Sequence, residues 1–86
     1  MKGYVYILQD ERGRFYVGST VDVLRSIRQH AQSHTQTTSN MLNPTLKLVQ
    51  EYSSLELARK IERKLKDMKR KDYIEKMVKD GYIKLR

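Results

Sequence analysis

Residues 4–18 read YVYILQDERGRFYVG and contain two short apolar stretches separated by a polar segment. The first stretch, residues 4–8, is β-branched and aromatic, which is typical of a buried strand. Residues 9–14 are polar and include Gly13, which indicates a turn, and residues 15–18 form a second strand. Two strands joined by so few residues predict an antiparallel hairpin.

Strand alternation sorts the side chains of this hairpin between two faces. Successive side chains point to opposite sides of a strand, so Tyr4, Tyr6 and Leu8 are predicted to share one face, with the residues between them on the other. By the same rule, Tyr16 and Gly18 share a face of the second strand.

A helix ending near Gln32 is predicted to follow the hairpin. Ser19, Thr20 and Asp22 are residue types that cap helix N-termini. At roughly 100° per residue, the apolar positions fall on one side of this helix, and we expect that side to face the core. These positions are Val23, Leu24, Ile27 and Ala31.

The segment after this helix predicts a loop and then a third strand. Residues 32–40 contain nothing to bury, which indicates a mobile surface loop. Residues 46–51 alternate in the manner of a strand, with Leu46, Leu48 and Gln50 on one side.

Two further helices are predicted in the rest of the chain. Ser53, with Glu56 three residues later, indicates a capping box at the start of the first one. A bend is expected at residues 69–72, with Asp72 as the next cap, and Gly81 is a suitable C-terminal stop. The apolar stripes of the two helices are Leu57, Ala58, Ile61, Leu65 and Met68, and then Ile74, Met77 and Val78.

The order of elements is strand, strand, helix, strand, helix, helix. This order predicts an α+β fold in which a small antiparallel three-stranded sheet has flanking helices. With 86 residues, the chain is expected to form one domain, residues 1–86.

Composition narrows the classes of function. The chain has no cysteine, which excludes disulfide scaffolds and thiol catalysis. No apolar stretch approaches the roughly 20 residues that span a bilayer, and the N-terminus lacks a signal peptide pattern. We therefore expect a cytoplasmic location and no membrane partner.

Positive charge is concentrated in the C-terminal third of the chain. The net charge is +8, and residues 59–86 hold 12 of the 18 basic residues but only 5 of the 10 acidic ones. Such a surface favours a polyanionic partner, most often nucleic acid. By composition alone, a solvated lysine-rich helix face explains the charge equally well.

Four short motifs occur in a fixed order along the chain. They are YVY at residues 4–6, YVG at residues 16–18, RSIRQH at residues 25–30, and a helical segment at residues 56–62. Together they resemble the signatures of the GIY-YIG nuclease family, which includes enzymes of DNA repair, and the resemblance covers nearly the whole chain. It implies a metal-dependent DNA endonuclease that hydrolyses phosphodiester bonds in duplex or branched DNA.

The resemblance also implies a role for individual residues. Glu62 would hold a single Mg²⁺ or Mn²⁺ ion, a hard cation that prefers oxygen ligands. Tyr6 and Tyr16 would deprotonate or orient the attacking water, with Tyr6 the preferred base, and His30 would assist the base or contact the phosphate. Taken singly, each residue is explained as well by packing or solvent exposure; the spacing of the set favours the site.

One position departs from the family pattern. The family's catalytic arginine lies one helical turn before the histidine, where this chain has Ser26. Serine cannot neutralise a phosphate as a guanidinium does. Arg25 is displaced by roughly 100° around the helix and could help only by bending its long stem toward the site. We therefore expect the fold to be kept and the rate to be reduced.

Three functions remain open on these grounds. The first is the endonuclease, and the second is a non-catalytic nucleic-acid-binding module, which the missing arginine favours. The third is a protein-interaction domain whose basic helices bind an acidic partner, and no specific feature supports it. The candidate nucleic-acid-binding residues are Arg28, Lys69, Arg70 and Lys71. At this length we expect no separate DNA-targeting domain, and we therefore expect specificity to come from this domain or from a protein partner.

Overall fold

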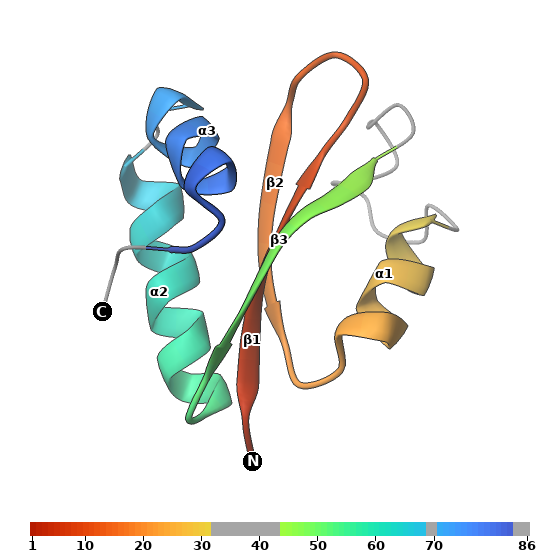
Figure 1. The fold of residues 1–86 in the computed structure, drawn as a ribbon. Coiled ribbons are helices and arrows are strands. Elements are labelled where there is room, and N and C mark those ends of the chain that lie inside the picture. The colour runs from red at the N-terminus through yellow and green to blue at the C-terminus, as the bar shows by residue number, and fades with distance from the viewer. Residues whose placement is uncertain (32–43, 69–70, 84–86) are drawn as a thin grey trace.

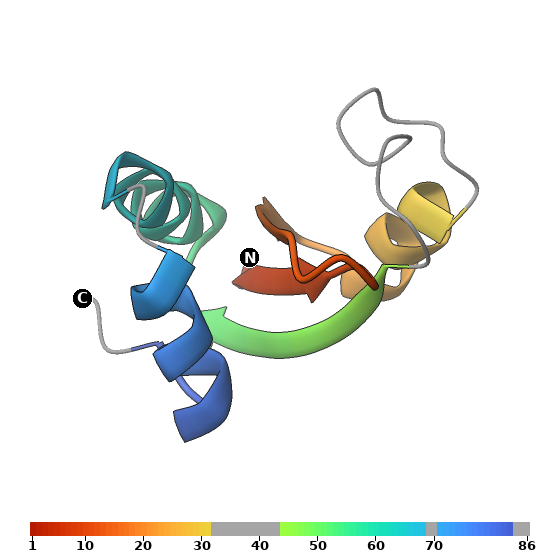
Figure 2. The same ribbon diagram turned by 90° about the horizontal axis from the view of Figure 1, so that it is seen from above.

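The computed structural model describes residues 1–31, 44–68 and 71–83, and it has the predicted α+β class. The antiparallel sheet has the strand order β2-β1-β3. The elements are β1 (Gly3–Gln9), β2 (Phe15–Thr20), α1 (Val23–Ala31), β3 (Thr45–Tyr52), α2 (Leu55–Met68) and α3 (Lys71–Asp80). Helices α2 and α3 lie on one side of the sheet and α1 lies on the other (Figures 1 and 2). The loop predicted at residues 32–40 falls outside the described residues.

A buried carboxylate organises the turn between β1 and β2. Asp10 is 6% exposed, and its Oδ1 accepts the backbone N–H groups of Arg12 at 3.0 Å and Arg14 at 2.8 Å. Gly13 lies at a φ of +85°, a conformation that glycine adopts without steric cost. The predicted hairpin therefore forms, and it is closed by side-chain as well as backbone hydrogen bonds.

The core lies between the sheet and helices α2 and α3. The predicted apolar stripe of α2 is confirmed, because Ala58, Ile61 and Leu65 are fully buried. Burying an aliphatic side chain the size of Ile61 or Leu65 contributes about 1.5–3 kcal/mol, so this buried cluster is a substantial source of hydrophobic stabilisation. The buried cluster comprises Val5, Ile7, Val17, Leu48, Ala58, Ile61, Leu65, Met77 and Ile83.

The predicted caps of helices α2 and α3 are both wrong. The cap of α2 is Ser54 rather than Ser53, because the Ser54 Oγ accepts the N–H of Leu57 at 3.1 Å. Asp72 lies inside the first turn of α3 and does not precede it. An acidic side chain there still interacts favourably with the helix dipole.

Helix α1 begins where predicted but turns a different side toward the sheet. Asp22 caps it, since its Oδ1 accepts the N–H of Arg25 at 3.1 Å. The prediction that Leu24 faces the core is wrong: Leu24 is 72% exposed, whereas Val23 and Ser26 are partly buried. Helical periodicity groups residues by side, but it does not determine which side a neighbouring element covers.

Strand β3 contains one irregularity where it pairs with β1. Ile7 lies opposite Leu48, whereas the next residue, Leu8, lies opposite Leu46, so Lys47 is an extra residue in β3. This bulge interrupts the predicted alternation. As a result, Leu48 is buried in the core and Leu46 is 41% exposed.

A side-chain amide of β3 ties down the segment after α3. Gly81, at a φ of +85°, ends the helix as predicted, and its N–H donates to the Met77 carbonyl at 2.9 Å. The Gln50 Oε1 then accepts the N–H of Ile83 at 2.6 Å, and the Gln50 Nε2 donates to the Ile83 carbonyl at 3.1 Å.

The described helices include none that is both long and apolar enough to cross a membrane.

Candidate active site

The two signature tyrosines lie side by side on neighbouring strands. In the β1–β2 register, Tyr6 is opposite Gly18 and Leu8 is opposite Tyr16. Opposite residues of an antiparallel pair project from the same face of the sheet, so the two tyrosines share a face. Their ring centroids are 6.3 Å apart with an interplanar angle of 39°, and Tyr6 is only 4% exposed.

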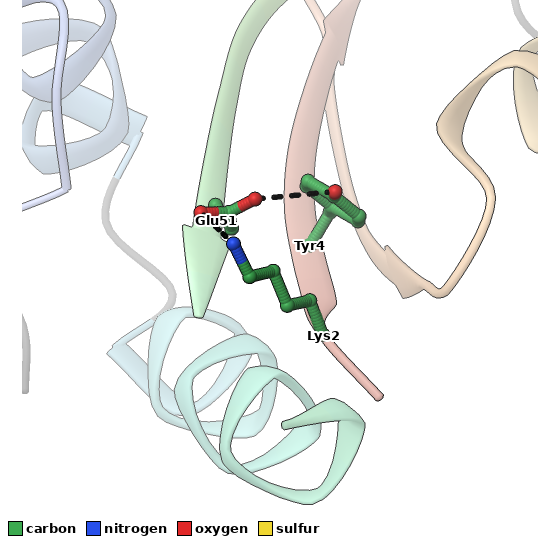
Figure 3. Close-up of polar contacts among 3 residues, drawn as sticks. All are labelled: Lys2, Tyr4 and Glu51. Carbon is green, nitrogen blue, oxygen red and sulfur yellow. Dashed lines mark hydrogen bonds and ion pairs between the residues drawn. The ribbon is translucent and has the colours of Figure 1, made fainter. Parts of the chain in front are cut away.

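The other tyrosine of the first signature points toward the opposite edge of the sheet. The Tyr4 hydroxyl donates to Glu51 Oε1 on β3 at 3.2 Å (Figure 3). The Lys2 ammonium contacts the second oxygen of the same carboxylate at 3.4 Å. Of the two tyrosines on β1, Tyr6 is therefore the one directed toward β2 and Tyr16.

Helix α2 brings Glu62 to the edge of the sheet formed by β2. The Ser19 hydroxyl donates to Glu62 Oε1, and the Lys66 ammonium lies 2.6 Å from Oε2. The Glu62 side chain is only 20% exposed. The reason is that the carboxylate is drawn against β2 by contacts on both of its oxygens.

Tyr6 is electrostatically linked to the residues around it. Burial raises the pKa of Tyr6 well above the usual tyrosine range, and the charges of Tyr16 and Glu62 raise it further. A hydrogen bond with Tyr16 raises the pKa as well, and one with the Ser26 hydroxyl lowers it. At neutral pH, Tyr6 is therefore protonated and can donate a hydrogen bond.

Ser26, which stands where the family pattern has an arginine, faces the pair of tyrosines Tyr6 and Tyr16, here called the tyrosine cluster. Besides its interaction with Tyr6, the Ser26 hydroxyl donates to Thr20 Oγ1 at 2.8 Å. Arg25 and Arg28 are both exposed on α1. Among the described side chains, the site therefore has a short hydroxyl where the family pattern has a guanidinium.

The structure describes some of the remaining predicted residues and not others. His30 lies in the last turn of α1, but its side chain is not among those described. Lys69 and Arg70 lie outside the described residues. Lys71 is exposed at the start of α3, and its Nζ is 3.2 Å from where a Cβ on Gly13 would lie, which places it beside the hairpin turn.

The donor set around Glu62 suits a single-carboxylate metal site. The described residues contain no group of three or more His, Asp and Glu side chains that could hold an ion. The two Glu62 oxygens face the Ser19 hydroxyl and the Lys66 ammonium, so Glu62 and Ser19 are the oxygen donors at this point. A hard divalent ion bound there would complete its coordination with water and phosphate oxygens.

Sequence reasoning missed two partners of Glu62. The i, i+4 spacing of Glu62 and Lys66 was available as a signal for the ion pair. Ser19 lies 43 residues away along the chain, so no local pattern indicates its contact.

Beside Glu62 is an open cavity of about 500 Å³, lined by Ser19, Arg59, Glu62, Arg63, Lys66 and Asp67.

Comparisons with known proteins identify the family and support the fold of this chain. A family model for the GIY-YIG catalytic domain matches residues 2–77. The solution NMR structure of the UPF0213 protein BH0048 from Bacillus halodurans is similar, with 30% sequence identity and a TM-score of 0.59. The match covers 94% of this chain and 87% of that one. A search of curated proteins found no match. The chain belongs to the GIY-YIG family, a family of nuclease type.

Proposed function

We propose that this protein is a metal-dependent endonuclease that hydrolyses phosphodiester bonds in duplex or branched DNA. The observation that carries the proposal is the meeting of Tyr6, Tyr16 and Glu62, which come from β1, β2 and α2. The charge of Glu62 acts on the Tyr6 hydroxyl, so the three groups form one electrostatic unit. If Tyr6 and Tyr16 served only to pack the sheet, a carboxylate such as that of Glu62 would not be required beside them.

Each of these residues has a task in the proposed reaction. Glu62 would hold one Mg²⁺ or Mn²⁺ ion, which when bound neutralises phosphate charge and lowers the pKa of a coordinated water. Tyr6, protonated and buried, would donate a hydrogen bond that orients the attacking water or a phosphate oxygen. Its raised pKa keeps the hydroxyl protonated at neutral pH, so Tyr6 would act as a base only if a nearby cation lowered that pKa. Tyr16 would orient the same groups from β2.

A second candidate function is a nucleic-acid-binding module without catalysis. The observation that favours it is Ser26, whose hydroxyl bonds to Thr20 and Tyr6 and offers no positive charge. In this case the basic residues of the last two helices would bind phosphates, and the tyrosine cluster would remain as part of the inherited fold.

A cleavage assay separates the two functions. The protein is incubated with duplex, branched and single-stranded DNA in the presence of Mg²⁺, Mn²⁺ or a chelator. We expect cleavage with either metal ion, none with chelator, and none for Tyr6→Phe or Glu62→Gln. Binding without cleavage under every condition supports the second function. Absence of both binding and cleavage contradicts both.

A further inference from the structure

We infer that Lys66 supplies the phosphate-binding positive charge that the site lacks at Ser26. The inference rests on the proposed function, because it assigns a role to Lys66 in contacting the phosphodiester that the site would cleave. Lys66 projects from α2 one helical turn after Glu62. It thus approaches the cluster from the opposite side of the sheet to Ser26, which lies on α1 (Figure 1).

Two contacts place the ammonium of Lys66 beside Glu62 and Tyr16. Its Nζ lies 2.6 Å from Glu62 Oε2 and 5.7 Å from the centroid of the Tyr16 ring. The second distance is within the range of an attractive cation–π contact. The ammonium therefore contacts two side chains of the proposed site, Glu62 and Tyr16, and the Tyr16 ring in turn lies 6.3 Å from the Tyr6 ring.

Lys66 is also available to an incoming phosphate. Its side chain is 52% exposed, whereas that of Glu62 is 20% exposed. A half-exposed i, i+4 ion pair contributes little to stability, so a phosphate can replace Glu62 as the partner of the ammonium at small cost. The flexible stem of lysine lets the charge move over a short distance without movement of α2.

The other described cations are less well placed. Arg25 and Arg28 are exposed on α1. Arg59 and Arg63 line the cavity beside Glu62 together with Lys66. Of this set, Lys66 combines an ion pair to the predicted metal ligand with a contact to a signature tyrosine.

The test compares Lys66→Met with Lys66→Arg, and Lys47→Met is the matched control. Methionine keeps most of the lysine stem and removes the charge, and Lys47 is an exposed lysine on β3, the sheet edge away from β2. We expect Lys66→Met to lower kcat by roughly 10²-fold, the effect of losing one transition-state contact, with a smaller change in KM. Lys66→Arg should retain activity, and Lys47→Met should match the native protein.

A compensating substitution makes the kinetic test specific. Adding Ser26→Arg to Lys66→Met restores the charge from the side of α1, so we expect it to recover the lost kcat. Thermal unfolding of each variant checks that the fold is intact. Equal kcat for Lys66→Met and the native protein would overturn the inference, as would failure of Ser26→Arg to rescue a folded Lys66→Met variant.

A binding measurement separates this inference from the proposed function. The affinity for a short DNA duplex is measured in chelator over a range of salt concentrations. Loss of one phosphate contact in Lys66→Met should reduce the slope of log Kd against log salt by about one, and Lys47→Met should not. If the native protein cuts no DNA but this slope changes, the nuclease function fails and the phosphate contact stands. If the native protein cuts DNA and both slope and kcat are unchanged in Lys66→Met, the inference fails and the nuclease function stands.

Discussion

The ring of Tyr6 lies across Gly18, its partner in the β1–β2 register. A Cβ atom at residue 18 would lie 2.5 Å from both Cζ and Oη of Tyr6, closer than non-bonded atoms approach. The glycine that ends the second signature is therefore required by the tyrosine that ends the first. The Tyr6 ring occupies the space that a side chain at residue 18 would fill.

Gly18→Ala should displace the Tyr6 ring and disturb the candidate site. Forcing a methyl group into this contact is expected to lower the free energy of unfolding by about 1–3 kcal/mol, because the ring or the strand must move. Urea unfolding and the cleavage rate measure the two effects. Adding Tyr6→Ala removes the clash, so the two substitutions should be less than additive in stability. Strict additivity would contradict the contact.

Glu62→Gln should abolish binding of Mn²⁺ while the fold survives. Glutamine keeps an acceptor for the Ser19 hydroxyl but loses the ion pair with Lys66, so we expect a stability change below about 1 kcal/mol. Electron paramagnetic resonance of free Mn²⁺ measures the binding, and thermal unfolding measures the stability. Glu56→Gln, an exposed carboxylate in the first turn of α2, is the control. Retained Mn²⁺ binding in Glu62→Gln would assign the ion to another carboxylate.

Ser26→Arg should raise the rate of metal-dependent DNA cleavage above that of the native protein. The substitution places a guanidinium on the side of α1 that faces Tyr6. Arginines in phosphoryl transfer contribute ~10³–10⁵-fold, which sets the upper limit for the gain. Tyr6→Phe or Glu62→Gln should then abolish it. Ser26→Ala is the size control, and an equal gain in this variant would show that charge is not the cause.

Arg25→Ala tests whether the neighbouring arginine has taken over the role of the missing one. Arg25 is exposed on α1, so its removal should change the cleavage rate by less than about twofold, the range of surface substitutions away from a site. Silencing of the native rate by Arg25→Ala would show that this arginine reaches the site when DNA is bound.

Stability should fall in alkaline solution because of buried tyrosines. Burial raises the pKa of Tyr6 and of Tyr52 in the folded state. The unfolded chain releases these protons near pH 10 while the folded protein keeps them, so the free energy of unfolding decreases as the pH rises above that value. Tyr6→Phe should flatten this decrease, as measured by urea unfolding between about pH 8 and pH 11. The exposed Tyr73, changed to Phe, is the control and should flatten it less.

The sequence alone determined the order of the elements and the faces of the hairpin. Strand alternation predicted that Tyr6 and Val5 point to opposite sides, and helical periodicity predicted the buried stripe of α2. These patterns are local, because the side chains that share a strand face or a helix side depend only on backbone geometry within a few residues. The spacing of the motifs likewise selected the candidate site residues. These are Tyr6, Tyr16 and Glu62, together with Ser26 at the position of the family's arginine.

Only the tertiary structure decided which of these surfaces are covered and by what. Leu24 is exposed although it lies on the apolar side of α1, and the extra residue Lys47 separates the faces of Leu46 and Leu48. The contact of Ser19 with Glu62 joins β2 to α2 across 43 residues. Such contacts depend on how the helices dock on the sheet, and docking minimises the energy of the whole core rather than that of any one segment. For that reason, the sequence could propose residues for the site, whereas the Ser19 and Lys66 contacts of Glu62 are given by the tertiary structure.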